Sequence, residues 1–163
     1  MELTLKEKVF LANQFKILES LYPDEAYIYE RHRNALEFGY TLQYDLITEW
    51  FSEELSEAAC QEVWDILEMH RSLKFAFDRL EDKGEIAEEQ ILFQGFDGNR
   101  EAKLMGYADY IINDLGRYSE LNRVDLNSHK PCVERYRKML AEWNQCKDKH
   151  FLKQDEILRI ISV

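Results

Sequence analysis

The sequence predicts an all-α fold: a single-domain bundle of about six to seven helices over residues 1–163, with an irregular glycine-rich loop in its middle. Only two prolines and six glycines occur in the chain, so long regular elements are expected. Apolar residues recur at helical spacing along most of it. The one stretch that alternates like a strand has no second strand to pair with, which argues against a sheet.

Residues 1–39 predict two helices. Thr4 and Glu7 have the spacing of a capping box at the start of a helix over 5–21. Pro23 suits the first turn of a second helix, and Gly39 suits its C-terminal stop. The apolar face of the first helix consists mainly of Leu5, Val9, Phe10, Phe15, Ile17 and Leu18.

Residues 40–51 fit two patterns. Leu42, Tyr44 and Leu46 alternate with other residues as in a strand, whereas Leu42, Leu46 and Trp50 recur as in a helix. A short helix is favoured, because no partner for a strand is present elsewhere in the chain.

The rest of the chain predicts four further helical segments. Ser56 is a good N-cap for the longest helix, which runs to about Asp82 and is followed by Gly84. The next helix stops at Gly116, another begins at Pro131, and a short one ends the sequence. Their apolar positions are Val63, Ile66, Leu67, His70, Leu73, Phe77 and Leu80, then Leu104, Met105, Ala108, Ile111, Ile112 and Leu115, then Tyr136, Met139, Leu140 and Trp143, then Ile157, Leu158 and Ile161.

The chain is acidic, with a net charge of −11 that is unevenly spread. Residues 49–89 carry a net charge of −9, and residues 117–163 carry +3. The simple interpretation is that the acidic residues coat the solvated face of a long helix; the alternative is that they meet the basic end of another copy. In either case the net negative charge repels a phosphate backbone, so no autonomous nucleic-acid binding is expected.

No membrane partner is expected, because no apolar run approaches the ~18 residues that a bilayer span needs. Residues 1–8 alternate charged and apolar side chains and lack a secretory signal region, so a cytoplasmic location is predicted. Cys60, Cys132 and Cys146 are odd in number and widely spaced, which indicates reduced thiols and no disulfide framework.

No metal site and no cofactor are predicted. A helical di-iron site needs a glutamate three residues before a histidine, but those positions hold Tyr29, Leu67, Leu126 and Lys147. Cys132 and Cys146 lie about 21 Å apart along one predicted helix at 1.5 Å per residue, too far for one zinc ion with bonds of ~2.3 Å. The sequence also lacks a P-loop, a dinucleotide fingerprint and a nucleophile elbow.

The segment Phe93–Arg100 is hard to explain as an ordinary surface loop. Gly95 and Gly98 flank an aromatic residue and an aspartate, and glycine permits positive φ and close backbone approach. If the polar connector Arg117–Lys130 folds back against this loop, the two would form a site for a small polar or anionic ligand, with an arginine to clamp it. The candidate ligand-binding residues are Asp97, Asn99, Arg117, Tyr118, Ser128 and His129.

A purely structural interpretation of the same residues stays open. Asp97 and Ser128 would then cap helices, Gly116 would stop one, and Arg117 would pair with a carboxylate. His70, within the apolar stripe of the longest helix, is interpreted as a core histidine with one hydrogen-bonding neighbour.

A set of short motifs runs along essentially the whole chain: Asn13-Gln14-Phe15, Asp65-Ile66-Leu67-Glu68-Met69, Gly95-Phe96-Asp97, Gly106-Tyr107, Gly116-Arg117-Tyr118, Tyr136, Met139-Leu140 and Trp143. Together, and in register, they resemble the YfbU family of bacterial proteins. The resemblance implies a small helical domain without an established activity, and no catalytic residue can be carried over. Some relatives are fused to a helix-turn-helix segment, which implies a ligand-sensing or partner-binding role, although this chain has no room for such a segment.

We therefore expect a cytosolic, self-associating helical domain that binds a small ligand or a protein partner, with a homo-oligomer as its assembly. The alternative is a metal-independent hydrolase that uses Asp97 with His129 or Arg117. That alternative requires the side chains to converge in one pocket within hydrogen-bond reach of a substrate. The sequence favours the binding domain over the enzyme, because no catalytic motif is present.

Overall fold

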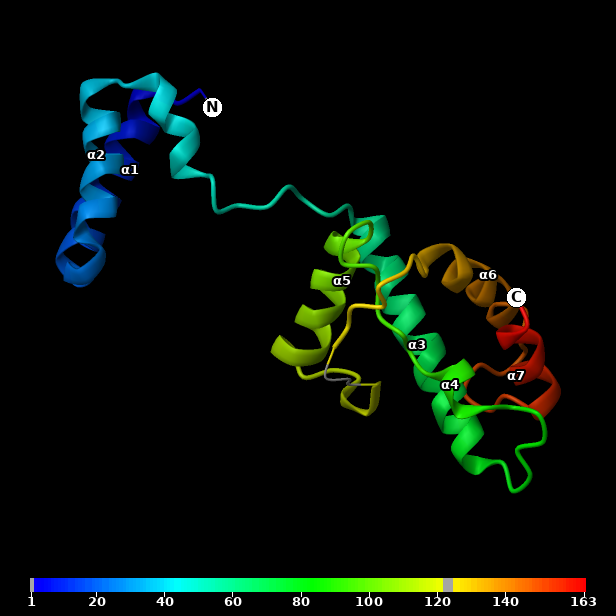
Figure 1. The fold of residues 1–163 in the computed structure, drawn as a ribbon. Helices are drawn as coiled ribbons and strands as arrows, with labels where there is room; N and C mark the ends of the chain where they lie inside the picture. Colours follow the sequence, from blue (N-terminus) through cyan, green and yellow to red (C-terminus); the bar gives the residue numbers. More distant parts are fainter. Residues whose placement is uncertain (1, 122–124) are drawn as a thin grey trace. The chain divides into compact units, whose positions relative to one another are not determined.

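The computed structural model describes residues 2–121 and 125–163 and is all-α, as the sequence predicts (Figure 1). No β-strand occurs in the described ranges; an isolated bridge joins Phe96 and Asn127. The chain forms two compact units, Met1–Glu54 and Leu55–Val163, called unit 1 and unit 2 below. Whether the two units fold as one domain stays a prediction. Residues 122–124 of the predicted connector lie outside the described residues.

Unit 1 begins with a helical hairpin. Helix α1 spans Leu5–Leu21, the predicted range, and packs against α2, Ala26–Phe38. The predicted capping box is present: the Glu7 backbone N–H donates to Thr4 Oγ1 over 3.3 Å, and the Thr4 N–H donates to Glu7 Oε2 over 2.7 Å. Gly39 ends α2 with a φ of 73°, a left-handed conformation that favours glycine.

Two short 3₁₀ helices complete unit 1. Pro23–Glu25 (η1) joins α1 to α2, so Pro23 begins a separate 3₁₀ turn and not the first turn of the second helix, which starts at Ala26. Thr41–Ile47 (η2) follows α2. The ambiguous segment is therefore a short helix and not a strand.

Unit 2 is built around α3, Glu57–Arg79, which Ser56 caps by accepting a hydrogen bond from the Ala59 N–H over 3.2 Å. The helix ends at Arg79, before the predicted Asp82. The shorter elements pack around it (Figure 1). They are α4 (Glu88–Ile91), α5 (Ala102–Asp109), a π-helical turn η3 (Tyr110–Asp114), a 3₁₀ turn η4 (Ser119–Leu121), α6 (Val133–Trp143) and α7 (Gln154–Ile161).

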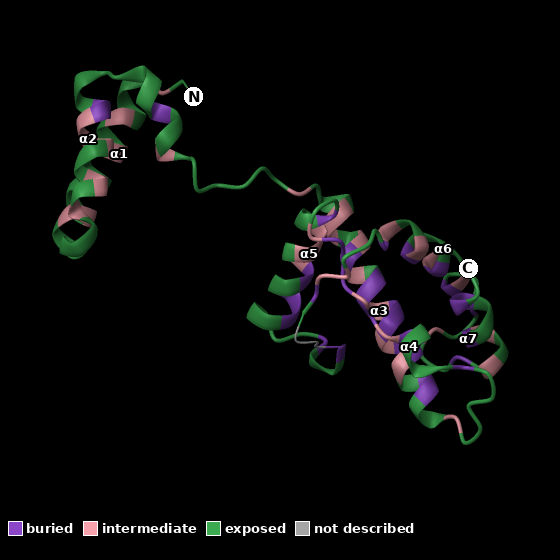
Figure 2. Ribbon diagram, viewed as in Figure 1, coloured by how far each residue is buried: buried purple, intermediate pink, exposed green. Residues whose placement is uncertain are grey.

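The two units differ in how much they bury (Figure 2). Buried residues line α3 and the elements around it, whereas the buried residues described in unit 1 are Ala35, Leu36 and Tyr44. Helix α1 has no buried residue at all. The hydrophobic core therefore lies in unit 2. Its largest fully buried side chains are Ile66, Leu67, Met69, Leu73, Ile91, Phe93, Phe96, Ile111, Tyr136, Met139 and Ile157.

Candidate functional site

The glycine loop and the polar connector of unit 2 lie side by side, as the sequence hypothesis requires. The Phe96 N–H donates to the Leu126 carbonyl over 3.0 Å, and the Ser128 N–H donates to the Phe96 carbonyl over 3.0 Å. The Gly98 N–H also donates to Asn127 Oδ1 over 3.0 Å. Phe96 and Gly98 of the loop are thus fixed to a connector about thirty positions further along the chain.

The glycine at position 95 is explained by this junction. Gly95 has a φ of 83°, and a Cβ atom there would lie 1.9 Å from the Leu126 carbonyl oxygen. Only glycine permits both the left-handed backbone and the close approach. Gly95 is therefore required by packing between two backbones, independently of any ligand.

Two buried carboxylates organise the loop from inside. Asp97 Oδ1 accepts a hydrogen bond from the Asn99 N–H over 3.0 Å, so this carboxylate closes a tight turn. Glu101 accepts hydrogen bonds from the N–H groups of Asp97, Cys132 and Val133 over 2.9 to 3.0 Å. Because the last two N–H groups lie at the start of α6, Glu101 supplies the partners that the first turn of a helix lacks.

Three other predicted site residues lie along the surface of the same region. His129 has a φ of 55°, and its side chain is 73% exposed, with Nε2 3.7 Å from Asp125 Oδ2. Ser128 donates its hydroxyl to the Lys130 carbonyl over 2.6 Å. Asn99 has an exposed side chain.

The remaining two candidates begin the connector. Arg117 is exposed, and its backbone N–H donates to the Ile111 carbonyl over 3.0 Å. Tyr118 is buried, has a φ of 53°, and donates its hydroxyl to Glu68 Oε2 on α3 over 3.0 Å. The guanidinium of Arg71 lies 4.0 Å from the Tyr118 ring centroid, and Arg71 also pairs with Glu120.

This cluster fixes the connector to α3. Burial, followed by the hydrogen bond to Glu68, raises the pKa of Tyr118 to about 12, so its hydroxyl stays protonated at neutral pH. Three of the six candidates therefore use their polar groups for hydrogen bonds within the protein: Asp97, Tyr118 and Ser128. Ligand binding by the six-residue set stays a prediction, and no contact among the described side chains links Asp97 with His129 or Arg117.

His70 occupies the middle of the aromatic core, as expected. Its Nδ1 lies 2.8 Å from the Ile91 carbonyl, and its ring contacts Phe93 and Tyr136 at centroid distances of 5.5 and 5.0 Å. Burial lowers the pKa of His70 to about 4, so the imidazole is neutral at pH 7. A neutral ring then donates from Nδ1 to the carbonyl.

Unit 1 carries most of the exposed large apolar side chains among the described residues. Phe10, Ile17 and Leu21 on α1 are 64%, 52% and 64% exposed. With the half-buried Leu3 they line two hollows, of about 500 Å³ around Phe10 and about 460 Å³ around Ile17. Both hollows lie along α1, and polar groups such as Lys6 border them.

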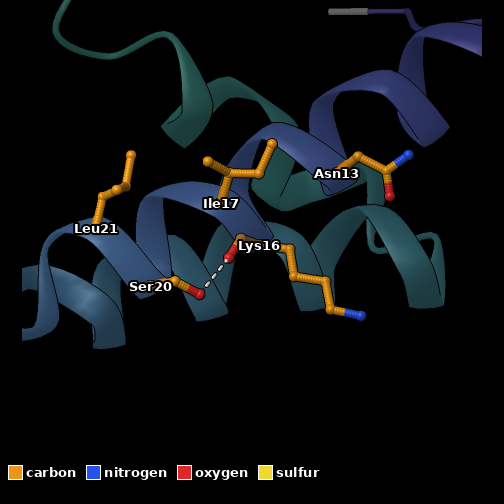
Figure 3. A pocket seen from close by; sticks show the side chains of 5 residues that line it. All are labelled: Asn13, Lys16, Ile17, Ser20 and Leu21. Carbon is orange, nitrogen blue, oxygen red and sulfur yellow. Dashed lines mark hydrogen bonds between the residues drawn. The ribbon is translucent and has the colours of Figure 1, made fainter.

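The second hollow is shown in Figure 3. Ile17 and Leu21 point to the same side of α1, and Asn13 lies farther along the helix. Ser20 donates its hydroxyl back to the Lys16 carbonyl over 3.2 Å, so it offers its hydrogen to the helix and not to the hollow.

A cavity of about 330 Å³ lies on the other helix of the hairpin, between α2 and η2. It is lined by Tyr27, Ile28, Arg31, His32, Ala35, Gln43, Leu46, Glu49 and Trp50. Burial lowers the pKa of His32, so its imidazole is neutral at pH 7; the nearby Glu49 charge acts in the opposite direction.

The family model that describes the YfbU domain matches residues 1–163. The chain belongs to the YfbU family. Both units of the structure lie within that match, so the hairpin of unit 1 is as much a part of the YfbU domain as the core of unit 2.

Two features are absent from the residues of the YfbU domain that the structure describes. No helix in those ranges is both long enough and apolar enough to cross a bilayer. No group of three or more histidine, cysteine, aspartate or glutamate side chains there is placed to hold a metal ion.

Sequence reasoning missed three features of the YfbU domain. No sequence pattern indicated the role of Glu101, because its partners are backbone groups of Cys132 and Val133, some thirty residues away. The exposure of α1 was missed because its apolar residues were interpreted as a core-facing stripe. The cavity of unit 1 could have been suspected from the exposed aromatic residues Tyr27 and Trp50, which flank the segment of ambiguous pattern.

Proposed function

We propose that this YfbU domain is a self-associating, partner-binding module, in which the outer face of α1 pairs with the same face of a second copy. The observation that carries this proposal is the exposure of α1: it is a helix of 17 residues with no buried residue, although it carries Phe10, Ile17 and Leu21. Contiguous exposed apolar surface of this kind is typical of interaction sites.

The spacing of the exposed residues supports a helix as the partner. Phe10 and Ile17 lie seven residues apart on α1, and Leu21 follows four residues later. A seven-residue spacing keeps apolar side chains on the seam between two helices that wind around each other.

The charge of α1 supports a second copy as the occupant. The whole chain carries −11, yet α1 contains three lysines and two glutamates. Two copies can therefore approach through α1 without the repulsion that the acidic segment 49–89 would produce. Cyclic dimers use one self-complementary patch on both subunits, and a single-helix stripe meets that requirement.

The small core of unit 1 gives a reason for pairing. Its buried residues in the described range are Ala35, Leu36 and Tyr44. Units of this size bury a small share of their apolar surface, and oligomerisation is a common way to stabilise them. A second hairpin would cover the α1 stripe and supply the missing core.

The cytosol is the proposed location of this assembly. All three cysteines, Cys60, Cys132 and Cys146, are free thiols, two of them buried. Unpaired thiols are typical of proteins in reducing compartments.

Sedimentation equilibrium over a range of concentrations tests the proposal. The wild-type chain should reach twice its mass of 19.6 kDa, whereas Phe10→Glu and Ile17→Glu should stay monomeric, because each places a charge on the seam. Phe75→Glu is the matched control: Phe75 is 49% exposed on α3, outside the stripe, so this variant should still dimerise. A wild-type chain that is monomeric at every concentration would refute the proposal, and so would dimers that both α1 variants retain.

A further inference from the structure

The cavity between α2 and η2 is separate from the α1 stripe and has no part in the proposed self-association. Its walls come from two elements of one compact unit: five lining residues belong to α2, and the others belong to η2 or follow it. Its volume of about 330 Å³ falls in the range of small-molecule sites. It combines apolar walls with a few polar groups, which is the usual composition of such sites.

Three polar side chains of the lining have no hydrogen bond or ion pair with another described residue: those of Arg31, Gln43 and Glu49. Arg33, nearby on the same helix, is by contrast paired with Glu19 and Glu37. Arginine and glutamate side chains left unpaired in one cavity are free to bind groups of opposite charge.

The two charges in the cavity have opposite signs and do not pair with each other. Arg31 comes from α2, and Glu49 comes from the segment after η2. His32 adds no positive charge at pH 7, because burial lowers its pKa. A ligand that satisfies both walls must therefore carry an anionic group for Arg31 and a cationic group for Glu49.

The rest of the lining is apolar or aromatic. Ile28, Ala35 and Leu46 offer aliphatic surface, and Tyr27 and Trp50 are 60% and 80% exposed around the cavity. When an apolar group covers aromatic rings with so much exposed area, a large apolar surface is removed from water, and this favours binding. The third requirement on a ligand is thus an apolar portion of modest size.

We propose that this cavity binds a free α-amino acid with an apolar or aromatic side chain. The carboxylate would pair with Arg31, the ammonium group with Glu49, and the side chain would lie against Trp50, Tyr27 and the aliphatic wall. The geometry assigns the recognition to unit 1 alone, so it does not depend on whether the protein dimerises.

Isothermal titration calorimetry of the full chain with L-phenylalanine and L-leucine is the direct test. Binding of one molecule per chain is expected. Two analogues separate the roles of the charges: 3-phenylpropionate lacks the ammonium group, and L-phenylalaninamide lacks the carboxylate. Each should bind at least tenfold more weakly than L-phenylalanine, because each leaves one charged wall without a partner.

Charge-neutral variants locate the site. Arg31→Gln and Glu49→Gln should each weaken binding of L-phenylalanine at least tenfold, and neither removes a hydrogen bond or ion pair between described residues. Glu30→Gln, on the exposed side of α2, and Arg100→Gln, in unit 2, are the matched controls and should bind as the wild type does. The indole N–H resonance of Trp50 should shift on titration, while those of Trp64 and Trp143 should not.

The outcomes are distinct. Failure of both amino acids to bind at millimolar concentration would overturn the proposal, as would an analogue that binds as tightly as L-phenylalanine. Binding that survives both Arg31→Gln and Glu49→Gln would place the ligand elsewhere and overturn it as well. The mass of the complex, measured on the same samples, reports self-association independently, so the failure of one proposal leaves the other testable.

Discussion

Helices α1 and α3 are both long, N-capped and rich in apolar residues, and they have opposite surroundings. Helix α3 buries nine of its 23 residues in the core of unit 2, whereas α1 buries none of its 17. Both helices begin with a capping residue, Ser56 or Thr4, and both carry bulky apolar side chains at helical spacing. The comparison teaches that periodicity identifies the side chains that gain from burial but does not identify the surface that buries them.

The largest effect is expected where unit 2 brings two backbones together. Gly95→Ala should lower the free energy of unfolding by about 3–5 kcal/mol, because it adds a clash with Leu126 to a strained left-handed backbone. Urea denaturation followed by circular dichroism measures the change. Gly106→Ala is the control: nothing lies within 4 Å of its new methyl group, and in α5 it should stabilise the protein by about 0.5–1 kcal/mol. Equal changes in the free energy of unfolding for the two variants would contradict the close packing of Gly95 against Leu126.

The second prediction compares α3 with α1 directly. Leu67→Ala should cost about 3 kcal/mol, because it leaves a cavity in the core. In dilute protein, where the chain is monomeric, Phe10→Ala should change the stability by less than about 0.5 kcal/mol. A cost for Phe10→Ala in dilute protein that equals the cost of Leu67→Ala would show that α1 is buried within a single chain.

The third prediction concerns pH and the core of unit 2. His70 has a pKa lowered from 6.5 to about 4 in the folded state, so the unfolded chain binds more protons between these values. The contribution of His70 to the free energy of unfolding is therefore fully present above pH 6.5, and it falls as the pH drops toward 4. From pH 7 to pH 4.5 this group should remove about 2–3 kcal/mol.

The variant His70→Gln isolates that contribution, since glutamine does not titrate. The difference between urea midpoints at pH 7 and pH 4.5 should be smaller in the variant than in the wild type. An unchanged difference would mean that His70 is not buried as a neutral ring.

The smallest effect is expected in the hairpin of unit 1. Arg33 of α2 pairs with Glu19 of α1 over 2.7 Å, and with Glu37 over 3.0 Å. Arg33→Gln should destabilise the hairpin by ~1 kcal/mol or less, because partly exposed ion pairs contribute little. Thermal unfolding in low and high salt checks this, and the difference between wild type and variant should shrink in high salt. A loss of several kcal/mol would show that polar contacts, not a missing partner, decide the stability of unit 1.

Local signals in the sequence predicted much of the fold. The start of α1 follows from Thr4 and Glu7, and the end of α2 follows from Gly39, because caps act through neighbouring residues. Helix α4 has one buried residue, Ile91, and so gave no periodic pattern. The end of α3 was placed too late, because helical spacing of apolar residues continues to Leu80 after the hydrogen bonding has changed.

For the candidate site, the sequence predicted only that the glycine loop and the polar connector lie side by side. Gly95 and Gly98 marked a close backbone approach, and the structure places the connector there. The role of each side chain depends on partners distant in sequence, such as Glu68 for Tyr118 and the start of α6 for Glu101. Such pairings follow from the folded arrangement, which sequence spacing does not encode.

Hydrogen exchange measured by mass spectrometry at two protein concentrations tests the central claim most directly, because one experiment reports on α1 and α3 together. We predict that amides of α1 exchange more slowly at the higher concentration, since a second copy covers them, while amides of α3 exchange at the same rate in both samples. Exchange in α1 that is independent of concentration would contradict the claim that another copy completes unit 1.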